Sequence, residues 1–142
     1  MILYLDTSAL VKLYCQETES EQVKELVKKA EIVATCRISY VEAKAAFSRK
    51  YWSKELTKND FQKLISGLEK DWPNYLAVEV STTVVEKAGD LVSTHNLRAY
   101  DALHIAAAQL LKEKSGLEVL FLTFDRDQKT AAIREGLKVP LQ

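Results

Sequence analysis

Short apolar runs alternate with longer amphipathic segments along this chain. The runs have the length and composition of buried β-strands, and the longer segments carry apolar residues at helical spacing. When strands alternate with helices, the helices form the crossovers between parallel strands and cover both faces of the sheet. The pattern therefore predicts an α/β fold, a three-layer α/β/α domain with a central, mainly parallel sheet of four to five strands.

The expected elements follow from these runs. Strands are predicted over Ile2–Leu5, Ile32–Thr35, Tyr75–Val80 and Glu118–Thr123, with Lys138–Val139 as a short edge strand. Helices are predicted over Thr7–Cys15, Ser20–Lys29, Ser39–Lys50, Thr57–Glu69, Thr82–Thr94, Ala99–Lys114 and Asp127–Glu135. No linker, repeat or low-complexity segment interrupts them. We therefore expect residues 1–142 to form a single domain, which is a typical domain size.

Charge and cysteine content limit the possible functions. Twenty basic residues balance twenty acidic residues, so nucleic-acid binding would need a local basic patch. Cys15 and Cys36 form neither a zinc motif nor a disulfide framework, and free thiols fit a reducing cytoplasm. No apolar run approaches the roughly 20 residues that cross a bilayer, and Met1–Leu5 lacks the basic start of a signal peptide. We expect a cytoplasmic protein without a membrane segment.

Four acidic residues lie where strands end or helices begin. Asp6 follows the first predicted strand directly, and Asp125 follows the fourth by two residues. Glu42 and Asp101 lie near the starts of helices. Ligands of open α/β sheets bind outside the carboxyl ends of the strands. Four separate segments can therefore bring carboxylates to one edge of the sheet.

Each acid also has a purely structural interpretation. Asp6 and Asp125 stand at helix N-cap positions. Ser39 and Glu42 form a capping-box pattern, in which Glu42 would only satisfy a backbone N–H. Asp101 lies in a first helical turn, where the helix dipole favours an acid. Its apolar neighbours would desolvate the carboxylate, however, and a desolvated carboxylate needs a partner.

Convergence of the four acids would favour a metal site. Two carboxylates about 5 Å apart repel by roughly 3 kcal/mol at an effective dielectric constant near 20. Cations or protons must offset that repulsion. Mg²⁺ and Mn²⁺ prefer oxygen ligands and can activate water for hydrolysis. We therefore interpret the acids as one divalent-metal site that can activate water.

The segments around the acids carry a family resemblance. They are Leu5–Tyr14, Ser39–Ala43, Arg98–Ala106 and Leu122–Arg126, in that order. Together with the chain length, they resemble PIN-domain ribonucleases of the VapC toxin type, from Ile2 to Val139. The resemblance matches the acidic residues of the family to Asp6, Glu42, Asp101 and Asp125, with no acid missing.

The resemblance implies a metal-dependent endoribonuclease that acts as the toxin of a toxin–antitoxin pair. It implies Mg²⁺ or Mn²⁺ as the cofactor, RNA as the substrate, a homodimer, and a small antitoxin that blocks the active-site groove. Asp6, Asp101 and Asp125 would be direct metal ligands, and Glu42 would bind the metal or orient water. Ser8 and Thr123 match hydroxyl positions that line such sites, although hydrogen bonding at a helix start or a strand end would also explain them.

Other polar residues have weaker assignments. Asp127 is a possible fifth acid, but it resembles no obligatory ligand of the family, and a first-turn helix charge is the better explanation. His104 has apolar neighbours, which favour a hydrogen-bonded core histidine over a general base. Arg98 could contact phosphate or an antitoxin, or could be a surface charge.

A basic stretch runs from Lys44 to Lys63. Its six basic residues are Lys44, Arg49, Lys50, Lys54, Lys58 and Lys63, and its two acids are Glu55 and Asp60, which leaves a local charge of +4. Arg49 and Lys50 are our candidates for contact with RNA or a partner, and nearby aromatic side chains could stack on bases. A solvated helix face, with Phe47, Tyr51 and Trp52 in the core or an interface, explains the same pattern.

Three other functions fit parts of the sequence. A phosphatase that forms an aspartyl intermediate would use Asp6 as its nucleophile, but such enzymes usually carry an acid where this chain has Ser8. A stand-alone RNA-processing or DNA-cleaving nuclease would need no antitoxin. A non-catalytic binding module would not need all four acids.

Overall fold

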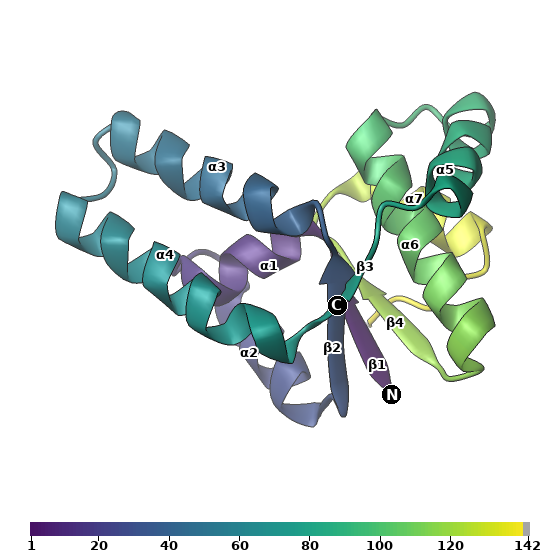
Figure 1. Cartoon of the computed structure of the whole chain (residues 1–142), viewed down its shortest axis with the longest axis horizontal. Helices are drawn as coiled ribbons and strands as arrows, with labels where there is room; N and C mark the ends of the chain where they lie inside the picture. The colour runs from purple at the N-terminus through teal and green to yellow at the C-terminus, as the bar shows by residue number, and fades with distance from the viewer. Residues whose placement is uncertain (141–142) are drawn as a thin grey trace.

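A computed structural model describes residues 1–140 as a four-stranded sheet with helices on both faces (Figure 1). The strands are β1 (Ile2–Leu5), β2 (Ile32–Cys36), β3 (Leu76–Val78) and β4 (Val119–Leu122). Their order is β3-β2-β1-β4, and every neighbouring pair is parallel. The predicted α/β/α fold is confirmed. In the centre of the sheet, β1 pairs Ile2 with Ile32 of β2 and with Val119 of β4.

The helices begin and end close to the predicted positions. They are α1 (Thr7–Tyr14), α2 (Ser20–Lys29), α3 (Ser39–Trp52), α4 (Lys58–Asp71), α5 (Thr82–Thr94), α6 (Ala99–Ser115) and α7 (Arg126–Arg134), with a 3-10 turn at Trp72–Asn74. Local chemistry sets several ends: Thr57 and Ser81 cap α4 and α5 by accepting backbone N–H groups. Gly116 ends α6 with a φ of 67°, a left-handed conformation that suits glycine. Within residues 1–140, no helix is both long and apolar enough to cross a bilayer.

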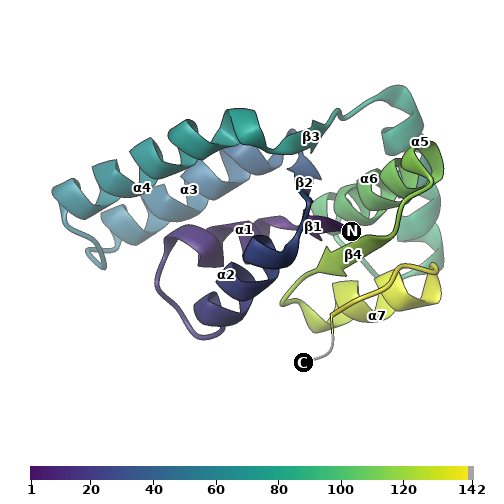
Figure 2. The same cartoon turned by 90° about the horizontal axis from the view of Figure 1, so that it is seen from below.

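The buried strand β1 divides the interior into two apolar clusters. Ile2 and Tyr4 pack on the side of α5, α6 and α7, whereas Leu3 and Leu5 pack on the side of α1 to α4. This alternation follows from the two-residue period of a strand. Figures 1 and 2 show the two helical layers on either side of the sheet. A strand covered on both faces can be apolar throughout, as β1 is.

Two predicted strands differ from the structure at the edges of the sheet. β3 is shorter than the predicted range Tyr75–Val80, because Tyr75 closes the 3-10 turn and Ser81 already caps α5. Lys138 forms a single parallel bridge with Leu120 instead of a fifth strand, and its carbonyl accepts the Phe121 N–H at 2.8 Å. Edge segments pair on one side only, so turn chemistry next to them determines where they end.

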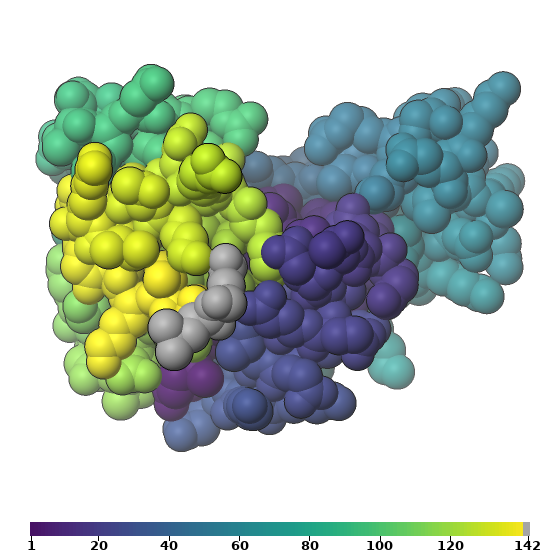
Figure 3. Space-filling model, turned by 180° about the vertical axis from the view of Figure 1, so that it is seen from behind, coloured from purple at the N-terminus to yellow at the C-terminus, as the bar shows by residue number. Residues whose placement is uncertain are grey.

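Helices α3 and α4 form a hairpin that projects from the sheet (Figures 1 and 3). The aromatic residues of α3 have different environments. Phe47 is buried, and Tyr51 stacks on Phe61 with ring centroids 4.9 Å apart. Trp52 is 76% exposed near the tip of the hairpin. The core interpretation therefore holds for Phe47 but not for Trp52.

Candidate active site

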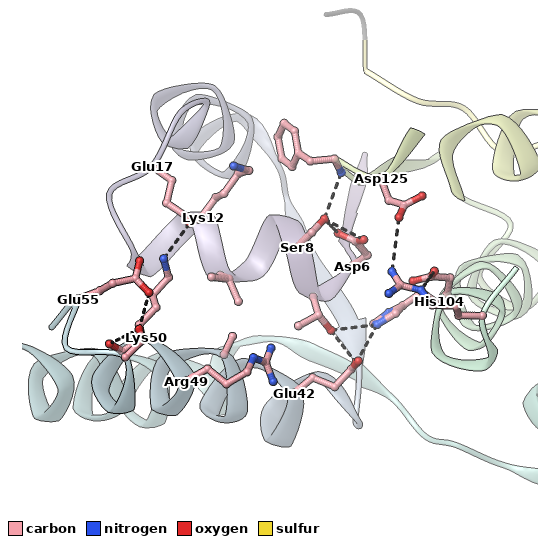
Figure 4. A pocket seen from close by; sticks show the side chains of 17 residues that line it. Asp6, Ser8, Lys12, Glu17, Glu42, Arg49, Lys50, Glu55, His104 and Asp125 are labelled. Atoms are coloured by element: carbon pink, nitrogen blue, oxygen red, sulfur yellow. Dashed lines mark hydrogen bonds and ion pairs between the residues drawn. The ribbon is translucent and has the colours of Figure 1, made fainter. Parts of the chain in front are cut away.

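The structure places all four predicted acids on one groove of about 730 Å³ at the carboxyl ends of β1, β2 and β4. Asp6 follows β1, and Glu42 lies in the first turn of α3, just after β2. Asp125 caps α7, which follows β4. Asp101 lies in the first turn of α6, and this helix follows α5 instead of a strand. Figure 4 shows Asp6, Glu42 and Asp125 approaching the groove from different elements.

Asp6 is a buried carboxylate held by several hydrogen bonds. Its exposed fraction is 3%. It accepts the Ala9 backbone N–H at 2.9 Å, as the predicted N-cap, and the Ser8 and Thr123 hydroxyls at 2.7 Å each. Burial raises the pKa of Asp6 even though His104 and these donors lower it. A carboxylate in that position gains from a nearby cation.

Ser8 and Thr123 line Asp6 and also stabilise the backbone around it. The Ser8 hydroxyl accepts the Phe124 N–H at 3.1 Å, and the Thr123 hydroxyl accepts the Asp125 N–H at 3.0 Å. Each hydroxyl therefore connects Asp6 to the turn that follows β4. Ser8 and Thr123 were predicted either to line the site or to form hydrogen bonds at a helix start and a strand end. They do both through the same contacts.

Glu42 does not form the predicted capping box. Ile38 precedes α3 with helical φ and ψ, and no side chain caps this helix. The Ser39 hydroxyl instead contacts the Thr35 hydroxyl at 2.7 Å. Glu42 faces the groove, where its Oε1 accepts from the Thr7 hydroxyl at 2.7 Å and from His104 Nε2 at 3.1 Å. Burial acts to raise the pKa of Glu42, but these two hydrogen bonds outweigh it and lower the pKa.

His104 is a buried histidine with both of its ring nitrogens hydrogen-bonded. Its exposed fraction is 2%, and its Nδ1 lies 2.8 Å from the hydroxyl of the buried Tyr4. With an ionised Glu42, Nε2 carries the proton and Nδ1 accepts from Tyr4. The predicted core histidine is confirmed, and its role extends to holding Glu42 in place. The contributions of Tyr4 and Thr7 were not predicted, because neither residue lies near His104 in the sequence.

Asp101 and Asp125 share one guanidinium group. Arg98 Nε lies 3.1 Å from Asp101 Oδ2, and Arg98 Nη2 lies 3.6 Å from Asp125 Oδ2. Asp125 also accepts the Gln128 N–H at 2.8 Å as the N-cap of α7. The Arg98 side chain is 81% exposed, so solvent screens these ion pairs and they add little to the stability of the fold. The positively charged guanidinium group of Arg98 therefore pairs with both Asp101 and Asp125.

Gln128 is a buried side chain that the sequence did not mark. Its Nε2 donates to the Asp101 carbonyl at 3.2 Å, and its Oε1 lies 2.7 Å from the Thr123 hydroxyl. Gln128 therefore ties α7 to the first turn of α6 and to the end of β4. Asp127, its neighbour, is exposed in the first turn of α7. It lies outside the groove and lines an adjoining hollow.

The chemistry of these donors fits a hard divalent cation. The groove presents four carboxylates, which Mg²⁺ and Mn²⁺ prefer, and Arg98 already bridges two of them with positive charge. In residues 1–140, no three Asp, Glu, His or Cys side chains converge closely enough to hold an ion as they stand. Each acid instead contacts a local hydrogen-bond or ion-pair partner.

The groove has a basic wall beyond the acids. Lys12, Arg49 and Lys50 line it, from α1 and α3, and Glu17 and Glu55 also line this part of the groove. Lys50 pairs with Glu17 at 3.2 Å, and the ammonium group of Lys12 lies 5.0 Å from the Phe124 ring centroid. The basic stretch predicted from Lys44 to Lys63 therefore contributes Arg49 and Lys50 to the groove, whereas Lys44 pairs with Glu69 at 2.7 Å.

Comparisons with known proteins agree with this architecture. The family model described as "PIN domain" matches residues 3–134. Ribonuclease VapC45 of Mycobacterium tuberculosis is 32% identical, and the match covers 97% of this chain and 94% of that protein. Ribonuclease VapC3 of Pyrobaculum aerophilum is 30% identical, with coverage of 89% and 91%.

Solved structures share the fold at lower identity. One is VapBC2 from Rickettsia felis bound to a DNA fragment from its promoter, with a TM-score of 0.67 and 17% identity over 99% of this chain and 98% of that one. Another is FitAcB from Neisseria gonorrhoeae, with a TM-score of 0.67 and 19% identity over 98% and 96%. The family model and the VapC relatives cover nearly all of the chain, and so this protein belongs to the PIN-domain family.

Proposed function

We propose that this chain is a divalent-metal-dependent endoribonuclease, with Asp6, Asp101 and Asp125 as metal ligands and Glu42 beside them. One observation carries the proposal: acids from four separate segments line the same open groove. The VapC relatives, which are named ribonucleases, support RNA as the substrate. The wide groove suits a polymer, and Arg49 and Lys50 in its wall suit phosphate oxygens.

The residues of this chain have distinct tasks in such a reaction. Asp101 and Asp125 lie at the groove surface, where they would hold Mg²⁺ or Mn²⁺ with Asp6 below them. A bound divalent ion supplies Lewis acidity, which activates water and offsets charge on the phosphate. Glu42, kept ionised by Thr7 and His104, would orient the attacking water. Arg98 would move from the acids to the phosphate when the cation binds.

The geometry disfavours a phosphoaspartate mechanism. Phosphatases of that class usually carry a second acid two residues after the nucleophile, but here Ser8 has that position and its hydroxyl donates to Asp6 at 2.7 Å.

We also propose that the protein acts in the cytoplasm as a homodimeric toxin whose groove a small antitoxin blocks. The VapC relatives and the likeness to VapBC2 support the pairing with an antitoxin.

Cleavage of a mixed RNA pool tests the proposed activity. We expect cleavage with Mn²⁺, none with EDTA, and none for Asp6→Asn or Asp101→Asn, both of which should fold. Asp90→Asn is the matched control, because it removes an exposed acid on α5 that lies outside the groove, and it should retain activity within a few-fold. Unchanged cleavage by both site variants would refute the ligand assignment. Co-purification of a small protein that suppresses cleavage would support the toxin role.

A further inference from the structure

Two further hollows continue from the groove beyond the four acids. A hollow of about 320 Å³ adjoins it and shares Arg98, Asp101 and Asp125 with its lining. A third hollow, of about 310 Å³, shares Asn96 and Leu97 with the second. The three hollows therefore form one path from the basic wall of α3, past the acids, to helix α7. We call the third hollow the α7 hollow.

The path contains every unpaired arginine of the described chain. Of the five arginines in the sequence, Arg37 pairs with Glu79 and Arg98 pairs with Asp101. Within residues 1–140, the guanidinium groups of Arg49, Arg126 and Arg134 have no hydrogen-bond or ion-pair partner. Arg49 lines the groove, and the other two line the α7 hollow. Guanidinium groups without protein partners are free to bind an anionic ligand.

Helix α7 presents its two arginines on one face. Arg126, Thr130 and Arg134 are spaced four residues apart, so they follow one another along the helix surface and line the α7 hollow. The opposite face packs against the domain, because Gln128 and Ala132 are buried. Across the hollow, His95 Nε2 lies 2.7 Å from Glu135, which anchors the facing loop. Asp127 is the single acid in the lining of this hollow.

We propose that the α7 hollow is a second phosphate-binding subsite for single-stranded RNA, at the opposite end of the path from Arg49. The inference rests on the proposed function and extends it, since it predicts where the strand runs beyond the cleaved bond. A strand carries a phosphate at each nucleotide, so its neighbouring phosphates must follow a path that is continuous with the acids. Guanidinium forks and the hydroxyl of Thr130 are suitable donors to phosphate oxygens.

Fluorescence polarisation in an Asp101→Asn background, with Mn²⁺, tests the subsite without cleavage. The probes are fluorescein-labelled single-stranded RNAs of 20 and four nucleotides. For Arg126→Gln/Arg134→Gln, we expect about tenfold or greater loss of affinity for the long probe and less than twofold for the short one. The salt dependence of long-probe binding should become less steep by about 0.7 for each phosphate that the variant no longer binds. Arg126→Lys/Arg134→Lys should recover part of the affinity, because the charge remains.

Arg37→Gln/Lys138→Gln is the matched control. It also removes two exposed, positively charged side chains, and both lie outside the path. Equal affinity of the α7 variant and this control for the long probe would overturn the subsite, while RNA binding by the parent would leave the proposed function intact. If the Asp101→Asn parent binds no RNA, both the subsite and the proposed function are refuted. Displacement of the long probe by polyglutamate, lost in the α7 variant only, would assign the hollow to an acidic protein segment and overturn the proposal.

Discussion

Replacing His104 by leucine should destabilise the fold through two buried or half-buried partners. The hydroxyl of Tyr4, whose side chain is 0% exposed, would lose its acceptor at 2.8 Å. Glu42 would lose the Nε2 donor at 3.1 Å. An unsatisfied buried polar group costs about 1–3 kcal/mol, and a hydrogen bond to a charged group contributes about 1.5–3 kcal/mol. Because the new leucine regains part of this by apolar burial, we expect a loss of about 2–4 kcal/mol.

A double-mutant cycle measured by urea unfolding with EDTA separates this network from simple loss of packing. Tyr4→Phe alone should destabilise the protein, because His104 Nδ1 loses its donor. Tyr4→Phe/His104→Leu removes both partners, so it should be less destabilised than the sum of the single variants by about 1 kcal/mol or more. Additivity within about 0.3 kcal/mol would refute the hydrogen-bond reasoning. In thermal unfolding, His104→Leu should lower the Tm by roughly 6–12 °C.

The dependence of the unfolding free energy on pH in the acidic range provides a second measurement of the same network. Burial acts to raise the pKa of Glu42, yet the hydrogen bonds from His104 and Thr7 lower it below the ordinary value of 4.5. A group whose folded-state pKa is lowered stabilises the fold above its unfolded-state pKa, and this stability is lost as the pH falls through the folded-state value. His104→Leu removes one donor, so its unfolding free energy should fall less between pH 5 and pH 3 than that of the parent. An identical slope would contradict the assignment.

Three further predictions concern the groove. Asp6→Asn should be more stable than the parent in EDTA, increasingly so as the pH rises, because burial raises the pKa of Asp6 and its charged form is the costly one; urea unfolding from pH 4 to pH 8 measures this, and a gap that shrinks with pH would contradict it. Arg98→Gln should bind Mn²⁺ severalfold more tightly by calorimetry, since a competing cation has been removed from two acids; weaker binding would show that the arginine assists the metal. Arg49→Ala/Lys50→Ala should weaken RNA binding and flatten its salt dependence, and an unaltered salt slope would exclude these residues from the RNA path.

Periodicity and turn chemistry were sufficient to predict most of the fold. Helix α2 and helix α5 match the predicted ranges residue for residue, because their apolar spacing and flanking residues agree. The caps at Asp6 and Asp125 also formed as predicted. The edge strand β3 was predicted too long, since sequence alone does not reveal where pairing with β2 stops.

The candidate site was only partly predictable. Position at the ends of elements was enough to select the four acids that line the groove. It could not reveal the partners of Glu42, because the Tyr4–His104 contact joins residues 100 positions apart. The same limitation concealed Gln128, a polar residue whose burial depends on α6 packing against α7. The capping-box pattern was wrong for Glu42, because such a pattern considers the residues of one helix end only. The partners of Glu42 come from other elements of the groove.

The central position of β1 has a consequence for the order of events during synthesis. Asp6 is synthesised 117 positions before Thr123, whose hydroxyl donates to it. Pairing at such long range is slow and completes late. A ribosome-bound chain that still lacks β4 and α7 has neither the second neighbour of β1 nor Asp125. A nascent chain would therefore remain unable to cut the RNA around it until β4 and α7 had left the ribosome.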